Sequence, residues 1–178
     1  WQMAQEFPQL RVTEIDLPEV IAEKQNRFER AKLALPPNLR MLSADLGVEA
    51  LAAVLGGEKA DVIAAEGLLG YFPLDQVKHI AAGVRQSLKD GGVFIADILT
   101  KEAVHMLTHD RSRQAASIFR RNAGNWLGIV DDPAHAQALF TAVGYAQVET
   151  RKLSEVAAQL ADVRKPVADL TLLIVARR

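Results

Sequence analysis

Carboxylate side chains stand at or near the ends of the first four apolar, strand-like segments of the chain. They are Asp16, Asp45, Glu66 and Asp97. In an open α/β sheet, ligands bind beyond the carboxyl ends of the strands, because loops and helix N-termini converge there. Acidic groups at that edge suit a ligand that presents hydroxyl and amino groups, and not one that presents phosphates. The residue types therefore indicate a binding site for a ligand of the first kind.

Two of these carboxylates also have a purely structural interpretation. Asp16 precedes Leu17-Pro18 and Asp45 precedes Leu46-Gly47, so either side chain is suited to capping the helix that follows it. Capping explains each residue taken alone. Their joint placement at one edge of a sheet favours the ligand site.

The carboxylates need a sheet to position them, and the order of the segments predicts one. Strand-like segments are expected at 11–16, 39–44, 61–65 and 93–98, with helices between them at 18–33, 48–55 and 74–88. Gly91-Gly92 is expected to end the third helix. A β-α-β order requires crossover connections, and hence a parallel sheet with helices on both faces.

The end of the chain departs from this alternation. A basic helical stretch is expected at 101–121 and a helix closed by Gly144 at 133–143. Two final strands at 145–153 and 170–176 are joined by a segment too short for a full parallel crossover, so we expect an antiparallel last strand. We expect one sheet and a single domain over residues 1–178.

Composition limits the classes of protein. The 178 residues carry a formal net charge of −1, which disfavours a nucleic-acid partner. No apolar run is long enough to span a membrane, and the chain has no cysteine for a disulfide or a thiolate metal site. A cytoplasmic location is expected, because no signal peptide is seen. The first residue is Trp1, and we expect the natural protein to contain a preceding segment.

Three motifs carry a resemblance to a known family. They are EIDLPEVI at 14–21, SADL at 43–46 and AEGLLGYF at 65–72. These motifs resemble the leucine carboxyl methyltransferase family of class I S-adenosylmethionine-dependent methyltransferases. The stretches 139–145 (LFTAVGY) and 171–178 resemble the late part of the same enzymes. The resemblance implies a Rossmann-like, doubly wound, mostly parallel sheet with an antiparallel last strand.

The resemblance also implies roles for particular residues around S-adenosyl-L-methionine. Asp16 is expected to bind the ribose hydroxyls, and Asp45 to accept a hydrogen bond from the adenine amino group. Glu66 is expected near the amino-acid end or the sulfonium of the cofactor. Three neighbours complete this cofactor site, and they are Leu17, Leu46 and Gly67. These enzymes open with a strand and a glycine-rich turn that this chain lacks, and the missing strand is expected between the first and third visible strands.

The methyl acceptor is expected to be a carboxylate or a hydroxyl of a small molecule or a protein. Tyr71 is placed at the mouth of the site, and Arg113 is a candidate for attracting a carboxylate. A hydroxyl acceptor needs a general base, for which His105 and His109 are candidates, although a solvated helix face explains both. We expect no metal site and leave a homodimer open. The alternatives are a nucleotide-dependent oxidoreductase and a non-catalytic module that kept the sheet.

Overall fold

The protein is described by a computed structural model that covers residues 1–109, 126–160, 167 and 169–178. The chain divides into two compact units, Trp1–Val54 and Leu55–Arg178, and each is described here by itself. The expectation of a single domain therefore stays a prediction. None of the helices in the described ranges has the length and apolar character that a bilayer-spanning helix requires.

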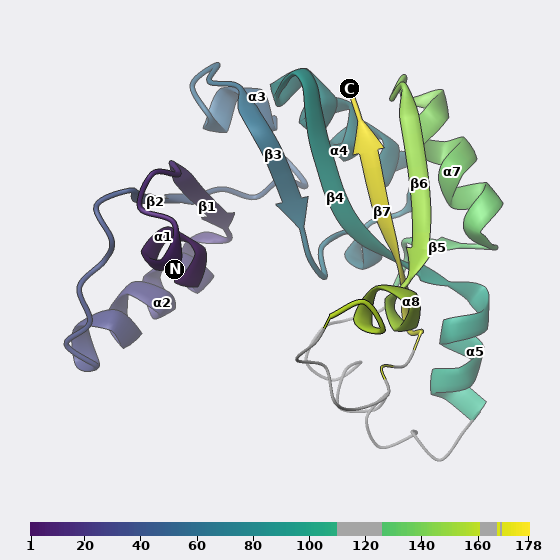
Figure 1. The fold of residues 1–178 in the computed structure, drawn as a ribbon, viewed down its shortest axis with the longest axis horizontal. Helices are drawn as coiled ribbons and strands as arrows, with labels where there is room; N and C mark the ends of the chain where they lie inside the picture. The colour runs from purple at the N-terminus through teal and green to yellow at the C-terminus, as the bar shows by residue number, and fades with distance from the viewer. Residues whose placement is uncertain (110–125, 161–166, 168) are drawn as a thin grey trace. The chain divides into compact units, whose positions relative to one another are not determined.

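The first unit is a pair of parallel strands with three helices (Figure 1). Its elements are α1 (Gln2–Glu6), β1 (Val12–Asp16), α2 (Pro18–Arg30), β2 (Leu39–Ser43) and α3 (Leu51–Val54). β1 and β2 run parallel, with Asp16 opposite Ser43. Pro18 occupies the first turn of α2, where its missing N–H removes no helical hydrogen bond.

The second unit is built on a mixed sheet with the strand order β3-β4-β7-β6, and β5 also pairs with β4. Its strands are β3 (Ala60–Ala65), β4 (Leu88–Thr100), β5 (Ile129–Val130), β6 (Gln147–Lys152) and β7 (Thr171–Arg177). Its helices are η1 (Leu69–Tyr71), α4 (Leu74–Ser87), α5 (Lys101–His109), α7 (Pro133–Ala142) and α8 (Leu153–Ala157). β7 is antiparallel to both of its neighbours, which confirms the predicted antiparallel last strand.

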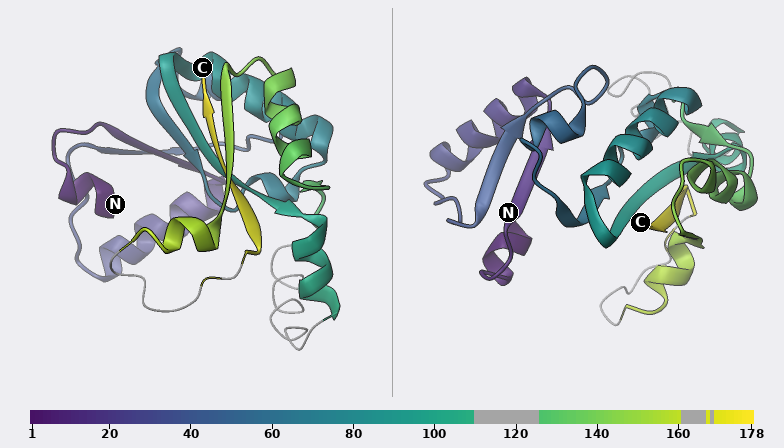
Figure 2. Two further views of the ribbon diagram at one scale, coloured as in Figure 1. Left: turned by 45° about the vertical axis from the view of Figure 1, so that its right-hand side comes forward. Right: turned by 90° about the horizontal axis from the view of Figure 1, so that it is seen from above.

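One face of this sheet is the core of the second unit. Figure 2 shows α4 and α7 side by side over it. Phe94 of β4 is fully buried there, with ring centroids 6.0 Å from Phe140 and 6.2 Å from Tyr145. The Tyr145 hydroxyl donates to the carbonyl of Ala81 at 2.9 Å, which links the end of α7 to α4. Since side chains alternate along a strand, Asp97 points to the opposite face of the sheet from Phe94.

One sequence-based expectation about sheet organisation differs from the structure. The strands of the described residues form two sheets, one in each unit, instead of the expected single sheet. In the described part of the chain, β1 and β3 each have one strand partner, because β1 pairs with β2 and β3 pairs with β4. The further strand expected between them stays a prediction.

The expectation that Gly91-Gly92 ends a helix is wrong. α4 ends at Ser87, and β4 begins at once at Leu88, with both glycines inside the strand. The pairing with β3 is irregular there, and Gly91 has φ +74°. A Cβ on Gly92 would lie 2.9 Å from the Lys89 carbonyl oxygen. The glycines therefore serve a close backbone approach within an irregular strand.

Other predicted helix and strand boundaries also differ from those in the structure. α2 ends at Arg30 and not at Leu33, through Lys32 in the left-handed region at φ +53°, so no glycine marks its end. α3 covers Leu51–Val54 rather than 48–55, and β5 was not predicted. The basic helix expected over 101–121 is described as far as His109, and the rest lies outside the described residues.

Candidate functional site

Asp16 and Asp45 lie at the same edge of the first unit's sheet, as the sequence predicted. The Ala44 N–H donates to the Asp16 carbonyl at 2.9 Å, which continues the parallel ladder to the residue before Asp45. Both side chains are exposed. Their carboxylates make only short-range contacts in the described part of the chain. Asp16 Oδ1 accepts from the Leu17 N–H and Asp45 Oδ1 accepts from the Gly47 N–H, each at 2.8 Å.

These contacts bear on the capping interpretation of the aspartates. The N-cap residue of helix α2 is Leu17, and no side chain caps this helix by a hydrogen bond, so Asp16 does not cap it. Asp45 closes a two-residue turn that precedes α3 by several residues. Each carboxylate uses one oxygen on the backbone. In the described residues the other oxygen has no partner, so it can accept a hydrogen bond from a hydroxyl or amino group of a ligand.

In the second unit, the Glu66–Gly67 turn follows β3 and lies beside β4. Both residues are exposed, and Gly67 has φ +64°, a left-handed conformation that favours glycine. The Gly67 N–H donates to Asp97 Oδ1 at 2.6 Å across the two parallel strands. The Glu66 carboxylate has no hydrogen-bond or ion-pair partner among the residues that the structure describes. It is therefore available to a positively charged ligand group.

The remaining predicted site residues fall in several places. Leu17 is 38% exposed at the start of α2, and Leu46 is half-buried in the turn after Asp45. Tyr71 is 40% exposed at the end of η1, in the second unit. His105 lies exposed on α5, and the side chain of His109 lies outside the description. Arg113 also lies outside the described residues.

A backbone clamp holds the η1 turn that carries Tyr71. The Gly70 carbonyl accepts from the Leu127 N–H at 2.9 Å and from the Gly128 N–H at 3.1 Å. A Cβ on Gly128 would lie 2.1 Å from the Leu69 carbonyl oxygen, so only glycine fits there. Sequence reasoning missed this clamp, because nothing local to Gly128 indicates that another loop packs on it.

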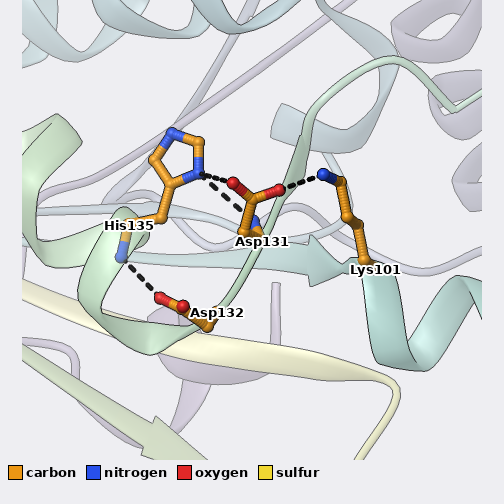
Figure 3. Close-up of polar contacts among 4 residues, drawn as sticks. All are labelled: Lys101, Asp131, Asp132 and His135. Carbon is orange, nitrogen blue, oxygen red and sulfur yellow. Dashed lines mark hydrogen bonds and ion pairs between the residues drawn. The ribbon is translucent and has the colours of Figure 1, made fainter.

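A second polar cluster was also missed, at the carboxyl ends of β4 and β5 (Figure 3). Asp131 forms an ion pair with Lys101 and lies 3.2 Å from His135 Nδ1. The hydrogen bond from Lys101 and its positive charge lower the pKa of the Asp131 carboxyl, and His135 contributes in the same direction. Asp132 accepts from the His135 backbone N–H at 2.8 Å as the N-cap of α7. The sequence signal that could have indicated this cluster is the presence of acidic residues four and three positions before His135.

Two further features do not contribute to this site. Within the ranges described, no group of His, Cys, Asp and Glu side chains has a metal-binding arrangement. The first unit has an apolar hollow of about 600 Å³ along α2, lined by Val20, Phe28 and Leu33 among others. Neither Asp16 nor Asp45 lines it, so it does not bear on the cofactor prediction.

A comparison with protein families agrees with the motifs. The model of the leucine carboxyl methyltransferase family matches residues 1–85. This stretch contains all three motifs, together with Asp16, Asp45 and Glu66. No curated protein sequence matches the chain.

Solved structures of methyltransferases share the fold of almost the whole chain. An O-methyltransferase family protein from Burkholderia thailandensis matches 99% of this chain and 46% of its own length, at 17% identity and a TM-score of 0.64. Human N-acetylserotonin methyltransferase, solved in complex with S-adenosylmethionine, matches 98% of this chain and 42% of its own length, at 16% identity and a TM-score of 0.63. An O-methyltransferase family 2 protein from Planctomyces limnophilus, solved in complex with apigenin, matches 98% of this chain and 45% of its own length, at 14% identity and a TM-score of 0.63.

The chain spans less than half the length of each of these three proteins. At such low sequence identity, the similarity establishes the fold and not the substrate. The predicted α/β fold class is confirmed, with its mostly parallel strands and its antiparallel last strand. The chain has the class I S-adenosylmethionine-dependent methyltransferase fold, and over residues 1–85 it is similar to the leucine carboxyl methyltransferase family, as its motifs predicted.

Proposed function

We propose that the protein is an S-adenosylmethionine-dependent methyltransferase that methylates an oxygen atom of its substrate, a carboxylate or hydroxyl of a small molecule or a protein. The observation that carries this proposal is the family match over residues 1–85. Those residues include Asp16, Asp45 and Glu66, the three strand-end carboxylates proposed to contact the cofactor. The methyltransferase fold of the structural neighbours supports it.

The chemistry of these residues fits the cofactor. The second oxygen of Asp16 accepts hydrogen bonds from the ribose hydroxyls, a role that acidic residues have in related nucleotide-binding sheets. The second oxygen of Asp45 accepts from the adenine amino group, and the Leu46 backbone faces the ring. Glu66, with no partner among the described residues, stabilises the positive charge of the amino group or the sulfonium. Leu17 in the first unit and Gly67 in the second are further candidate cofactor contacts.

When bound, S-adenosylmethionine supplies an electrophilic methyl group. The protein binds and orients the reactants and excludes water. A carboxylate acceptor is ionised at neutral pH and needs no general base. For a hydroxyl acceptor, His105 is the candidate base on α5, with Tyr71 at the mouth of the site and Arg113 as a candidate contact for an anionic acceptor. The cytoplasmic location, the absence of a nucleic-acid partner and a homodimer stay predictions.

Calorimetric titration of the full-length protein tests this proposal. We expect micromolar binding of S-adenosylmethionine and of S-adenosylhomocysteine, and no comparable binding of NAD. Preference for NAD would instead support an oxidoreductase, and no binding of either by a folded, full-length protein would support a non-catalytic module.

A further inference from the structure

The contact between Asp97 and Gly67 joins two strands of the second unit at their carboxyl ends. The Gly67 N–H and Asp97 Oδ1 lie 2.6 Å apart, although the residues are 30 positions apart in sequence. A hydrogen bond to an ionised acceptor is shorter and stronger than a neutral one. This contact therefore restrains the backbone immediately after Glu66.

Packing does not provide that restraint. Gly67 is exposed, and a Cβ added to it would meet nothing within 4 Å. Its φ of +64° is one of several that glycine adopts readily, so the conformation of this turn is not fixed by the residue itself. Among the described residues, Asp97 is the hydrogen-bond partner that fixes the turn from outside.

Asp97 lies on the half-buried face of β4, away from the core around Phe94. It lies opposite Leu173 of β7, which is also half-buried. A carboxylate at such a position is satisfied by a hydrogen bond. Within the described residues, its one hydrogen bond goes to Gly67. Its chemistry therefore serves the turn rather than the sheet.

We propose that Asp97 is a positioning residue that holds the Glu66–Gly67 turn so that the Glu66 carboxylate faces the positively charged end of S-adenosylmethionine. This inference rests on the proposed function, because it takes Glu66 as a cofactor contact. Asp97 acts through the Gly67 N–H and does not itself touch the cofactor.

The test is a mutant cycle on the full-length protein, with the dissociation constant of S-adenosylmethionine measured by calorimetry. Asp97→Ala is expected to weaken binding about tenfold or more, the size of a lost charge-assisted hydrogen bond. Asp97 affects binding only by positioning Glu66. The double mutant Asp97→Ala/Glu66→Gln is therefore expected to bind the cofactor no more weakly than the single mutant Glu66→Gln. Full additivity of the two losses, or wild-type affinity of a folded Asp97→Ala protein, would overturn the inference.

A second variant separates positioning from direct contact and covers the case in which Asp97→Ala does not fold. The amide oxygen of Asp97→Asn still accepts from the Gly67 N–H, so affinity is expected within about threefold of wild type. A loss as large as that expected for the alanine variant would mean that the charge of Asp97 contacts the cofactor, and would overturn the inference. Asp61→Asn, at the other end of β3 and 80% exposed, is the matched control and is expected to bind normally.

The same cycle distinguishes this inference from the proposed function. If Glu66→Gln weakens binding and Asp97→Ala does not, the inference fails and the methyltransferase proposal stands. If the wild-type protein does not bind S-adenosylmethionine, both fail. Hydrogen exchange of the Gly67 amide provides a readout without ligand, and it is expected to be faster in Asp97→Ala than in Asp97→Asn.

Discussion

The carboxylates at the strand ends of the two units hold their surroundings in different ways. In the first unit, Asp16 and Asp45 bind the N–H groups one and two residues further along the chain. In the second unit, Asp97 accepts from an N–H that is 30 residues away, in the turn after the neighbouring strand. In the local contacts, one carboxylate oxygen of each aspartate accepts a hydrogen bond from the turn that the aspartate itself begins. The cross-strand contact shapes a turn that belongs to another element.

This difference predicts how each region responds to mutation. Removing a carboxylate of the first unit is expected to delete the proposed ligand contact and to leave the fold nearly unchanged, because the lost backbone bond is local and exposed. The turns of the second unit depend on partners distant in sequence, so changes at those partners alter stability and site geometry together. The following experiments test this contrast, beginning with the largest expected effect.

Gly128→Ala is expected to destabilise the second unit by about 3 kcal/mol, because the new Cβ would overlap the Leu69 carbonyl oxygen at the clamp below Tyr71. Urea denaturation of the full-length protein measures the change. Gly83→Ala is the control, since its Cβ meets nothing within 4 Å and alanine favours the helix. Equal stability of the two variants would show that the η1 turn is not held by this clamp.

Asp16→Ala is expected to weaken S-adenosylmethionine binding by about 1.5–3 kcal/mol, through loss of hydrogen bonds to a charged acceptor. The melting temperature is expected to change little, because the aspartate caps no helix. Calorimetry and thermal unfolding measure the two effects. Glu19→Gln, an exposed carboxylate on the next turn, is the control. Unchanged affinity in a folded Asp16→Ala protein would remove Asp16 from the site.

Asp45→Ala is expected to weaken binding by about 1.5 kcal/mol, the lower end of the same range, because one amino group is its partner. Adenosine itself is the informative ligand, and its affinity is expected to fall as much as that of the whole cofactor. Equal losses for methionine-type ligands without adenine would contradict the assignment of Asp45 to the ring.

Tyr145→Phe is expected to cost about 1 kcal/mol of stability, because the hydroxyl donates to Ala81 in the core of the second unit. Burial raises the pKa of the Tyr145 hydroxyl above its ordinary value. The stability it contributes is therefore fully present below pH ~10 and is lost as the pH rises above that value. Chemical denaturation between pH 8 and 11 is expected to show a weaker alkaline loss in the mutant. The same slope in both proteins would contradict this assignment.

Lys101→Gln is expected to have the smallest effect. Lys101 is the main cause of the lowered pKa of the Asp131 carboxyl, so this pKa is expected to rise toward its ordinary value in the mutant. The ion pair is exposed, and its small contribution is present above the ordinary carboxyl pKa and is lost as the pH falls. NMR titration of the Asp131 carboxyl measures the shift. An unchanged titration would show that the contact of Figure 3 does not persist in solution.

Sequence reasoning predicted much of this fold because the relevant signals are local. The apolar strands, the start of α2 at Pro18 and the end of α7 near Gly144 follow from residue types within a few positions. It failed at Gly91-Gly92, where the same residue type serves a close approach inside a strand and not a helix end. β5, with two residues, was too short to produce a detectable pattern.

The amino-acid sequence by itself determined which side chains end the strands, and hence the prediction that these carboxylates contact a ligand. Periodicity and strand direction are properties of short segments, so this placement could be predicted before any contact was known. Only the tertiary structure decided which N–H each carboxylate binds. Gly67 meets Asp97, and Gly128 meets Leu69, because strand pairing and loop packing bring together residues whose separation in sequence carries no signal of contact.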